Sequence, residues 1–175
     1  MSDRDRQLAK TFFFWVAAGL KREYKSLDIV FVAHTTEAWE FSEPDFFKVT
    51  GSGGTVASVG LAKVREIMEA RFDPAGCNVY LFYASDGDNA SDDRTQAGEE
   101  LEAIAEDVRY AGYVEISTGV RSSLSETSSL FQSVADDGFP CSRFTIAGPD
   151  DIAPAVRHFF SVESQLGSDD AGGTP

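Results

Sequence analysis

The stretch 78–89, NVYLFYASDGDN, constrains the fold of this chain more than any other part of the sequence. It begins with a continuous apolar and aromatic run, 79–83, and ends in a polar turn, 85–89. A continuous apolar run without polar alternation predicts a strand that is buried on both faces of a sheet. In open α/β sheets, ligands bind just beyond the carboxyl ends of such strands. We therefore expect Asp86 and Asp88 to lie where chemistry or metal binding is usually placed.

The acidic composition limits the partners that this chain can bind. Its 175 residues are one domain by length, large enough to bury an α/β core. The 29 acidic and 15 basic residues give a net charge of -14, which disfavours nucleic acid and an anionic membrane surface as partners. The longest apolar run near the start, 12–20, is too short to span a bilayer, and no signal segment is recognised. Because nothing in the sequence marks the chain as secreted, Cys77 and Cys141 are expected to be buried or half-buried thiols rather than a disulfide, and we expect a cytoplasmic protein.

Apolar periodicity predicts alternating helices and strands. Because strands alternate with helices, we expect an α/β fold with a mostly parallel central sheet and helices on both faces. The strand at 38–41 is expected to turn back antiparallel against the one before it. The chain begins with a helix, so the strand that a doubly wound fold would place first is absent. We expect one domain over 1–166 and a disordered tail over 167–175. The helices are expected at 3–24, 56–72, 95–108, 125–135 and from 152 onward, and the strands at 27–33, 38–41, 78–85, 112–117 and 142–147.

Two polar loops form the candidate site. One is the glycine-rich loop 50–55, which ends in Thr55, and the other is the loop that carries Asp86 and Asp88. A hard cation such as Mg²⁺ takes carboxylate, hydroxyl and water oxygens as ligands, and it needs only a few of them from the protein. His34, at the end of the strand 27–33, is placed to reach the same edge. The residue pattern alone also fits a simpler interpretation, two polar loops without a metal.

Other motifs are rejected. The glycine-rich loop lacks the spacing of a dinucleotide motif, and no Gly-Lys-Ser/Thr follows for a phosphate loop. The segment that starts at Asp86 has Ser91 at position six and Ala97 at position twelve, which excludes a calcium-binding EF-hand. His158 is expected to be a surface or packed histidine. The aromatic run 12–15 is expected to pack in the core and between elements.

An ordered set of short motifs resembles the YeaH/YhbH family of von Willebrand factor A-like proteins, over most of the chain to about residue 160. The resemblance implies a Rossmann-like von Willebrand factor A-type fold with a metal-ion-dependent adhesion site built from three loops. It makes Thr55 the second element of that site and Asp86 the third. The motifs are Phe13-Phe14-Trp15, residues 29–38, Phe46-Phe47, Ser52-Gly53-Gly54-Thr55 and Ala84-Ser85-Asp86-Gly87-Asp88-Asn89. By the same likeness, the further ligands, or partners of ligands, are His34, Ser52, Gly53, Gly54, Ser85, Asp88 and Asn89.

The first element of that site, an Asp-x-Ser-x-Ser motif, is missing from this sequence. In the family, that motif is followed by a methionine and a charged stretch, which Met1 and the residues after it resemble. The resemblance therefore implies a fragment or a misassigned start site. The absent strand would be the central one, between the strands that end at His34 and Ser85, and its loss would leave two apolar edges unpaired.

Three functions are compatible with these observations. The resemblance implies a module that holds Mg²⁺, or another divalent cation, through Thr55 and Asp86 and presents it to a carboxylate of a protein partner. It also implies a stress or sporulation role beside a serine protein kinase or a SpoVR-like protein. The alternative is a metal-dependent hydrolase or phosphotransferase that uses Asp86 and Asp88, although no nucleophile or base beyond His34 is found. The third is that the chain alone is inactive, with weak or absent metal binding.

Overall fold

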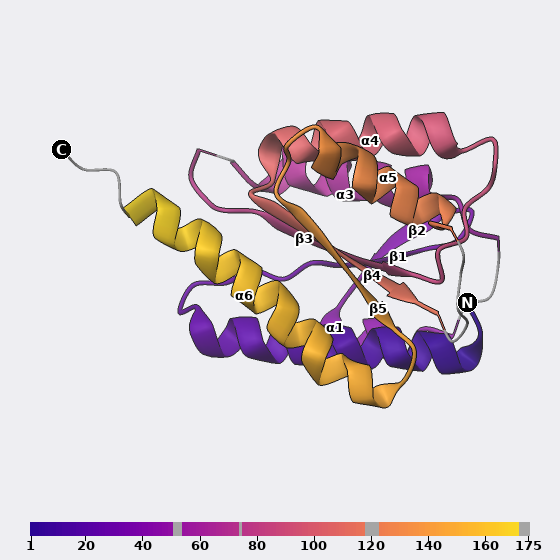
Figure 1. Cartoon of the computed structure of the whole chain (residues 1–175), viewed down its shortest axis with the longest axis horizontal. Helices are drawn as coiled ribbons and strands as arrows, with labels where there is room; N and C mark the ends of the chain where they lie inside the picture. The colour runs from indigo at the N-terminus through magenta and orange to yellow at the C-terminus, as the bar shows by residue number, and fades with distance from the viewer. Residues whose placement is uncertain (51–53, 74, 118–122, 172–175) are drawn as a thin grey trace.

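The computed structural model describes residues 1–50, 54–73, 75–117 and 123–171, with only the backbone for 163–171. The expected mixed α/β organisation is confirmed, and each predicted helix and strand is present within a few residues of its expected bounds (Figure 1). Residues 167–171, in the segment expected to be a disordered tail, continue the last helix. The elements are α1 (Asp3–Glu23), β1 (Phe31–His34), β2 (Ala38–Phe41), α2 (Glu43–Phe46), α3 (Ala57–Arg71), β3 (Tyr80–Ser85), α4 (Arg94–Asp107), β4 (Tyr110–Ile116), α5 (Glu126–Asp136), β5 (Cys141–Ile146), a 3-10 turn η1 (Pro149–Asp151) and α6 (Ile152–Ala171).

Strands β3, β4 and β5 form a parallel sheet with β4 in the middle. Every residue of β4 is buried, whereas burial alternates along β3 between buried and half-buried residues. The prediction that the strand ending at Ser85 is buried on both faces is therefore wrong, and that property belongs to β4. The physical reason is the strand order, because β3 is hydrogen-bonded on only one edge in this sheet.

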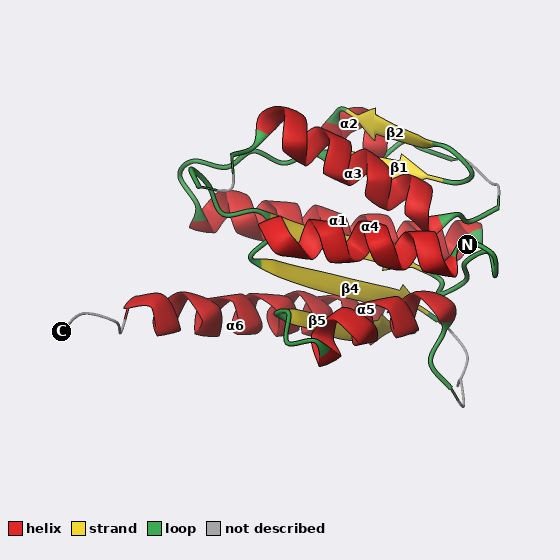
Figure 2. Ribbon diagram, turned by 90° about the horizontal axis from the view of Figure 1, so that it is seen from above, coloured by secondary structure: helices red, strands yellow, loops and turns green. Residues whose placement is uncertain are grey.

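Strands β1 and β2 form a separate antiparallel hairpin, with Phe31 opposite Phe41 and His34 opposite Ala38. This confirms the predicted hairpin. Within the described part of the chain, no strand pairing joins β1 to β3, and Figure 2 shows the hairpin set apart from β4 and β5. The sheet is thus a three-stranded parallel one beside a hairpin, and the expected single central sheet is interrupted between β1 and β3.

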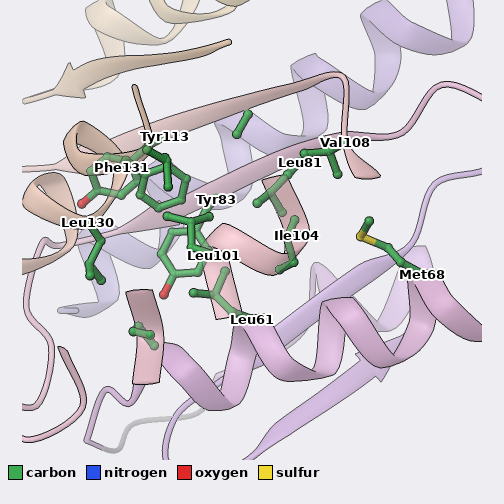
Figure 3. Close-up of a cluster of buried hydrophobic side chains, with 14 residues drawn as sticks. Leu61, Met68, Leu81, Tyr83, Leu101, Ile104, Val108, Tyr113, Leu130 and Phe131 are labelled. Carbon is green, nitrogen blue, oxygen red and sulfur yellow. The ribbon is translucent and has the colours of Figure 1, made fainter. Parts of the chain in front are cut away.

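Helices cover both faces of the parallel sheet, as expected. On one face, α3, α4 and α5 pack against Leu81, Tyr83 and Tyr113 (Figure 3). On the other face, α1 and α6 pack against alternate residues of β4, including Tyr110 and Val114. Burial of a large apolar side chain stabilises a fold by roughly 1.5–3 kcal/mol, so the two clusters of such side chains supply most of the driving force.

The first helix shows how local sequence fixes an element. Ser2 caps α1 and forms a reciprocal capping box with Asp5, and Lys21 and Arg22 in the last turn complement the helix dipole. Its buried stripe, at spacings of three and four, binds it to β4 and α6. The stripe consists of Leu8, Ala9, Phe12, Val16 and Ala17.

Candidate metal site at the carboxyl ends of the strands

The loop that follows β3 is joined to the loop that precedes α3. The backbone N–H of Ala90 donates to the Thr55 carbonyl at 3.1 Å. The side-chain Oδ1 of Asn89 accepts from the backbone N–H of Ala57 at 2.9 Å, at the start of α3. These bonds cross more than thirty residues of sequence and hold Thr55 beside the loop that carries Asp86. Thr55, the described end of one predicted loop, therefore lies beside the other loop, as the sequence predicts.

The carboxylate of Asp93, on the same loop as Asn89, completes the cap of α3. Asp93 is only 7% exposed, and its Oδ2 accepts from the backbone N–H of Ser58 at 3.0 Å, while its Oδ1 accepts from the Ser58 hydroxyl. Val56, the N-cap residue, makes no side-chain capping bond, so the loop from another part of the chain supplies it. Asp93 appears in the sequence as one of a surface acidic pair, and no local pattern distinguishes it from Asp92.

The turn after Ser85 requires glycine. Gly87 has φ +88°, and a Cβ there would lie 2.6 Å from the Cβ and Oγ of Ser125. The N–H of Gly87 donates to Ser85 Oγ at 3.0 Å, and that oxygen lies 3.0 Å from the Tyr113 hydroxyl. The Ser85 hydroxyl thus stabilises the turn, and it forms hydrogen bonds with Gly87 and Tyr113.

The start of α5 clamps the same turn. Thr127 donates to the Gly87 carbonyl from its backbone N–H at 3.1 Å and from its hydroxyl at 3.2 Å. Beside it, the hydroxyls of Ser125 and Ser128 donate to Glu115 Oε2 at 2.5 Å and 2.6 Å. Glu115 is 8% exposed and lies at the end of β4, in register with the end of β3. Sequence reasoning missed this buried carboxylate, whose only signal is a charged residue inside the apolar run of β4.

Asp86 is half-buried in the turn and lies beside a cationic group. Its Oδ2 lies 2.5 Å from the terminal ammonium of Met1, and its side chain is 20% exposed. The amino terminus therefore lies at the end of the sheet toward which the strands point (Figure 1). A carboxylate in this position can hold a positive charge directly or through water.

His34 lies between the two sheets. Its Nε2 is 2.8 Å from the Tyr83 hydroxyl, and its ring packs so closely on α3 that a Cβ at Gly60 would lie 2.6 Å from His34 Cδ2. Its Nδ1 is buried and makes no hydrogen bond. Burial lowers the pKa of His34, so the ring is neutral in the folded protein. His34 therefore connects β1 to β3, and the contacts that define its position are not with Asp86.

Three aromatic rings support the turn and the histidine from inside the core. Tyr113 and Phe131 stack with their centroids 4.8 Å apart, and Tyr83 packs against both (Figure 3). Burial raises the pKa of Tyr83 and of Tyr113, so both hydroxyls stay protonated and available as hydrogen-bond partners. The hydroxyls reach His34 and Ser85 respectively, which ties the site to the rigid core.

The remaining predicted site residues are less informative. Gly54 lies in an exposed segment with Thr36 in van der Waals reach of a Cβ placed there, and Asp88 is exposed on the loop after β3. Ser52 and Gly53 lie outside the described residues. His158 is half-buried and packs between Phe144 and Phe159, as predicted for a packed histidine.

The donor set fits a lightly coordinated hard cation better than a fully enclosed one. Over the described ranges, no group of three or more His, Cys, Asp or Glu side chains is arranged to hold a metal ion. Both cysteines are free thiols; Cys141 is half-buried, as predicted, whereas Cys77 is exposed rather than buried or half-buried. Asp86 with a nearby threonine loop is a set of oxygen donors, which Mg²⁺ accepts while keeping several waters.

Comparison with known proteins decides the family. The model of a family described as "Protein of unknown function (DUF444)" matches residues 1–163. The chain belongs to the DUF444 family. This confirms the YeaH/YhbH-like family resemblance at the level of DUF444 and UPF0229 proteins. No solved structure matches the DUF444 chain.

Its relatives are longer proteins. A UPF0229 protein of Serratia proteamaculans is 35% identical over 168 residues, which cover 94% of this chain and 38% of the relative. A UPF0229 protein of Chelativorans sp. is 37% identical over 172 residues, with 94% and 39% covered. One from Halalkalibacterium halodurans is 32% identical over 161 residues, with 92% and 40% covered. The DUF444 chain thus spans about two fifths of the length of these relatives.

Within the described residues, no helix combines the length and the apolar character needed to cross a membrane.

Proposed function

We propose that this DUF444 chain is a von Willebrand factor A-like module that holds Mg²⁺ at Thr55 and Asp86 and presents it to a carboxylate of a protein partner. The observation that carries the proposal is the joining of the two loops. Ala90 bonds to the Thr55 carbonyl and Asn89 caps α3, so a hydroxyl-bearing residue and a carboxylate from distant parts of the chain share one edge.

The charge at Asp86 supports the same proposal. Its carboxylate follows the carboxyl end of β3 directly and its side chain is 20% exposed, so a cation can reach it. Mg²⁺ keeps part of its hydration shell when only one or two protein ligands are available. Bound by Asp86 and the Thr55 loop, it would retain water positions that a carboxylate of a partner can replace. In this arrangement the protein binds and orients, and no covalent step is needed.

The fold assignment rests on the interruption in the sheet. The β1 edge that faces away from β2 and the β3 edge that faces away from β4 carry no strand pairing among the described residues. His34 and Tyr83 meet across this interruption at 2.8 Å. We propose that in the complete domain a central strand lies between β1 and β3, with its carboxyl end beside Asp86. That strand would bring the first loop of the adhesion site, the Asp-x-Ser-x-Ser motif.

The partner is proposed from the family likeness. A serine protein kinase or a SpoVR-like protein, in a stress or sporulation response, is the partner that the YeaH/YhbH resemblance implies. The chemistry required of either is a surface aspartate or glutamate that reaches the metal. A cytoplasmic location is proposed from the sequence, in which the two cysteines are interpreted as thiols rather than as a disulfide.

The metal test is a titration with Mg²⁺, in which calorimetry measures the affinity. It is carried out on the chain and on a version extended upstream of Met1. Thr55→Ala and Asp86→Ala are expected to lower Mg²⁺ affinity, and the extended version is expected to bind more tightly than the chain itself. Asp92→Ala, an exposed carboxylate on the same loop, is the matched control and should leave affinity unchanged. Equal affinity in the wild type and both site variants would refute the proposal.

A further inference from the structure

Helix α1 exposes two large aromatic side chains. Phe14 is 52% exposed and Trp15 is 54% exposed, whereas Phe12 is fully buried. The sequence predicts that the run 12–15 packs in the core and between elements. Phe14 does contact Phe47 between elements, but the expectation is wrong for Trp15, which falls on the helix face that points away from α6 and β4. Exposed aromatic pairs of this size mark interaction surfaces more often than isolated apolar residues do.

The aromatic pair is held rigidly before anything binds. The rings of Phe14 and Trp15 meet edge to face with centroids 5.6 Å apart, and Phe14 meets Phe47 in the same way at 6.1 Å. Phe47 in turn packs against Phe46 and Phe31 in the core beside the β1–β2 hairpin. Because the rings are already ordered, little side-chain entropy of Phe14 and Trp15 is lost when a partner covers them.

Two unpaired arginines lie in line with the aromatic pair. Arg4 precedes Trp15 by eleven residues and Arg22 follows it by seven, so both lie within about 20° of Trp15 around the helix, at about 16 Å and about 10 Å along it. Among the described residues, neither arginine makes an ion pair. We call Arg4, Phe14, Trp15 and Arg22 the α1 stripe.

Apart from the exposed Glu23, the other charged side chains of α1 are already engaged. Asp3 pairs with Arg6, Asp5 bonds to Ser2, and Lys21 pairs with Glu43. The helix carries five basic and three acidic residues in a chain whose net charge is -14. The α1 stripe is thus a basic and aromatic surface on an acidic protein. Helix α1, which carries it, lies along the edge of the molecule away from α3, α4 and α5 (Figure 1).

We propose that the α1 stripe binds an acidic helical segment of a partner protein. The partner places an apolar side chain on Phe14 and Trp15 and a carboxylate on each of Arg4 and Arg22. Charge complementarity selects an acidic partner, and the two arginines call for two carboxylates. A polyanion such as a nucleic acid, or an anionic bilayer, is repelled by the strongly negative remainder of the chain, whereas a short peptide with few charges meets only the stripe. This surface is independent of the proposed metal site.

The test uses a fluorescein-labelled helical peptide of about 22 residues, long enough to span the stripe at about 1.5 Å per residue. The peptide carries one leucine on the face that meets the stripe. One glutamate stands seven residues before that leucine and another stands eleven after it, for an antiparallel approach. Binding is measured by fluorescence anisotropy with the whole chain, and circular dichroism checks that each variant is folded.

Trp15→Ala is expected to weaken peptide binding at least about tenfold, since a central aromatic residue dominates such contacts. Arg4→Gln and Arg22→Gln are expected to weaken it about two- to fivefold each, with the loss reduced at high salt. Trp39→Ala and Arg157→Gln are the matched controls, because both residues are exposed but lie on β2 and α6, and both should bind as the wild type does.

Three outcomes with the peptide would overturn the proposal. The first is the absence of binding to the acidic peptide. The second is equal binding by Trp15→Ala and the wild type, and the third is equal binding of a peptide in which both glutamates are glutamine. Tighter binding to single-stranded DNA or to vesicles that contain phosphatidylserine would also overturn it, by assigning the stripe to a different class of partner.

Discussion

Replacing Gly87 by alanine tests whether the turn after β3 is clamped by α5. Gly87 has φ +88°, a conformation that costs a residue with a Cβ about 1–2 kcal/mol. The new Cβ would also lie 2.6 Å from Ser125, whose hydroxyl donates to Glu115 at 2.5 Å, so α5 must shift. Overpacking of this kind costs about 1–3 kcal/mol. We therefore expect Gly87→Ala to lower the free energy of unfolding by about 2–5 kcal/mol, the sum of these two costs.

The chain offers a matched control for the backbone cost alone. Gly138 has φ +93°, and a Cβ there would meet no atom within 4 Å. Gly138→Ala should therefore cost only the conformational part, about 1–2 kcal/mol. Urea unfolding followed by circular dichroism measures both variants, and thermal midpoints should fall by about 2–4 °C for each kcal/mol. If the two alanine variants are equally destabilised, the clamp of α5 on the turn is refuted.

Three further predictions concern buried polar groups. Burial lowers the pKa of His34 below its ordinary value of 6.5, so the unfolded chain takes up a proton first as pH falls. Stability contributed by the neutral ring is therefore complete above pH 6.5 and declines below it, and His34→Gln should flatten this decline in urea unfolding measured from pH 8 to pH 5. Glu115→Ala leaves the Ser125 and Ser128 hydroxyls without their acceptor and should cost about 1–3 kcal/mol, whereas Glu115→Gln keeps an acceptor and should cost less; equal losses in urea unfolding would contradict this. Asp93→Ala should cost about 1–2 kcal/mol through loss of the α3 cap, and thermal unfolding of the alanine variant of its exposed neighbour Asp92 should show no such loss.

Much of the fold could be predicted because its signals are local. The apolar run before Ser85, the alternation at 38–41 and the capping box at Ser2 each use neighbouring residues to define an element, and all three elements are observed. The meeting of the Thr55 and Asp86 loops could also be expected, since parallel strands and the helices between them bring such loops to one edge.

Other features depend on contacts between distant residues. The apolar runs of β3 and β4 resemble each other, and only the strand order makes β4 the fully buried one. Asp93 and Asp92 are alike in sequence, yet the fold turns one toward Ser58, 35 residues away. Glu115 is a buried carboxylate because the start of α5 brings two hydroxyls to it.

The sequence by itself determined the elements, their α/β class and the edge at which the polar loops meet, because helix and strand periodicity and capping act over a few residues. Tertiary structure alone decided which faces are covered. Phe12 and Trp15 belong to one aromatic run, and only the packing of α1 against β4 and α6 buries the first and exposes the second. Burial of a side chain is decided by its partners, and those partners come from parts of the chain that no local pattern identifies.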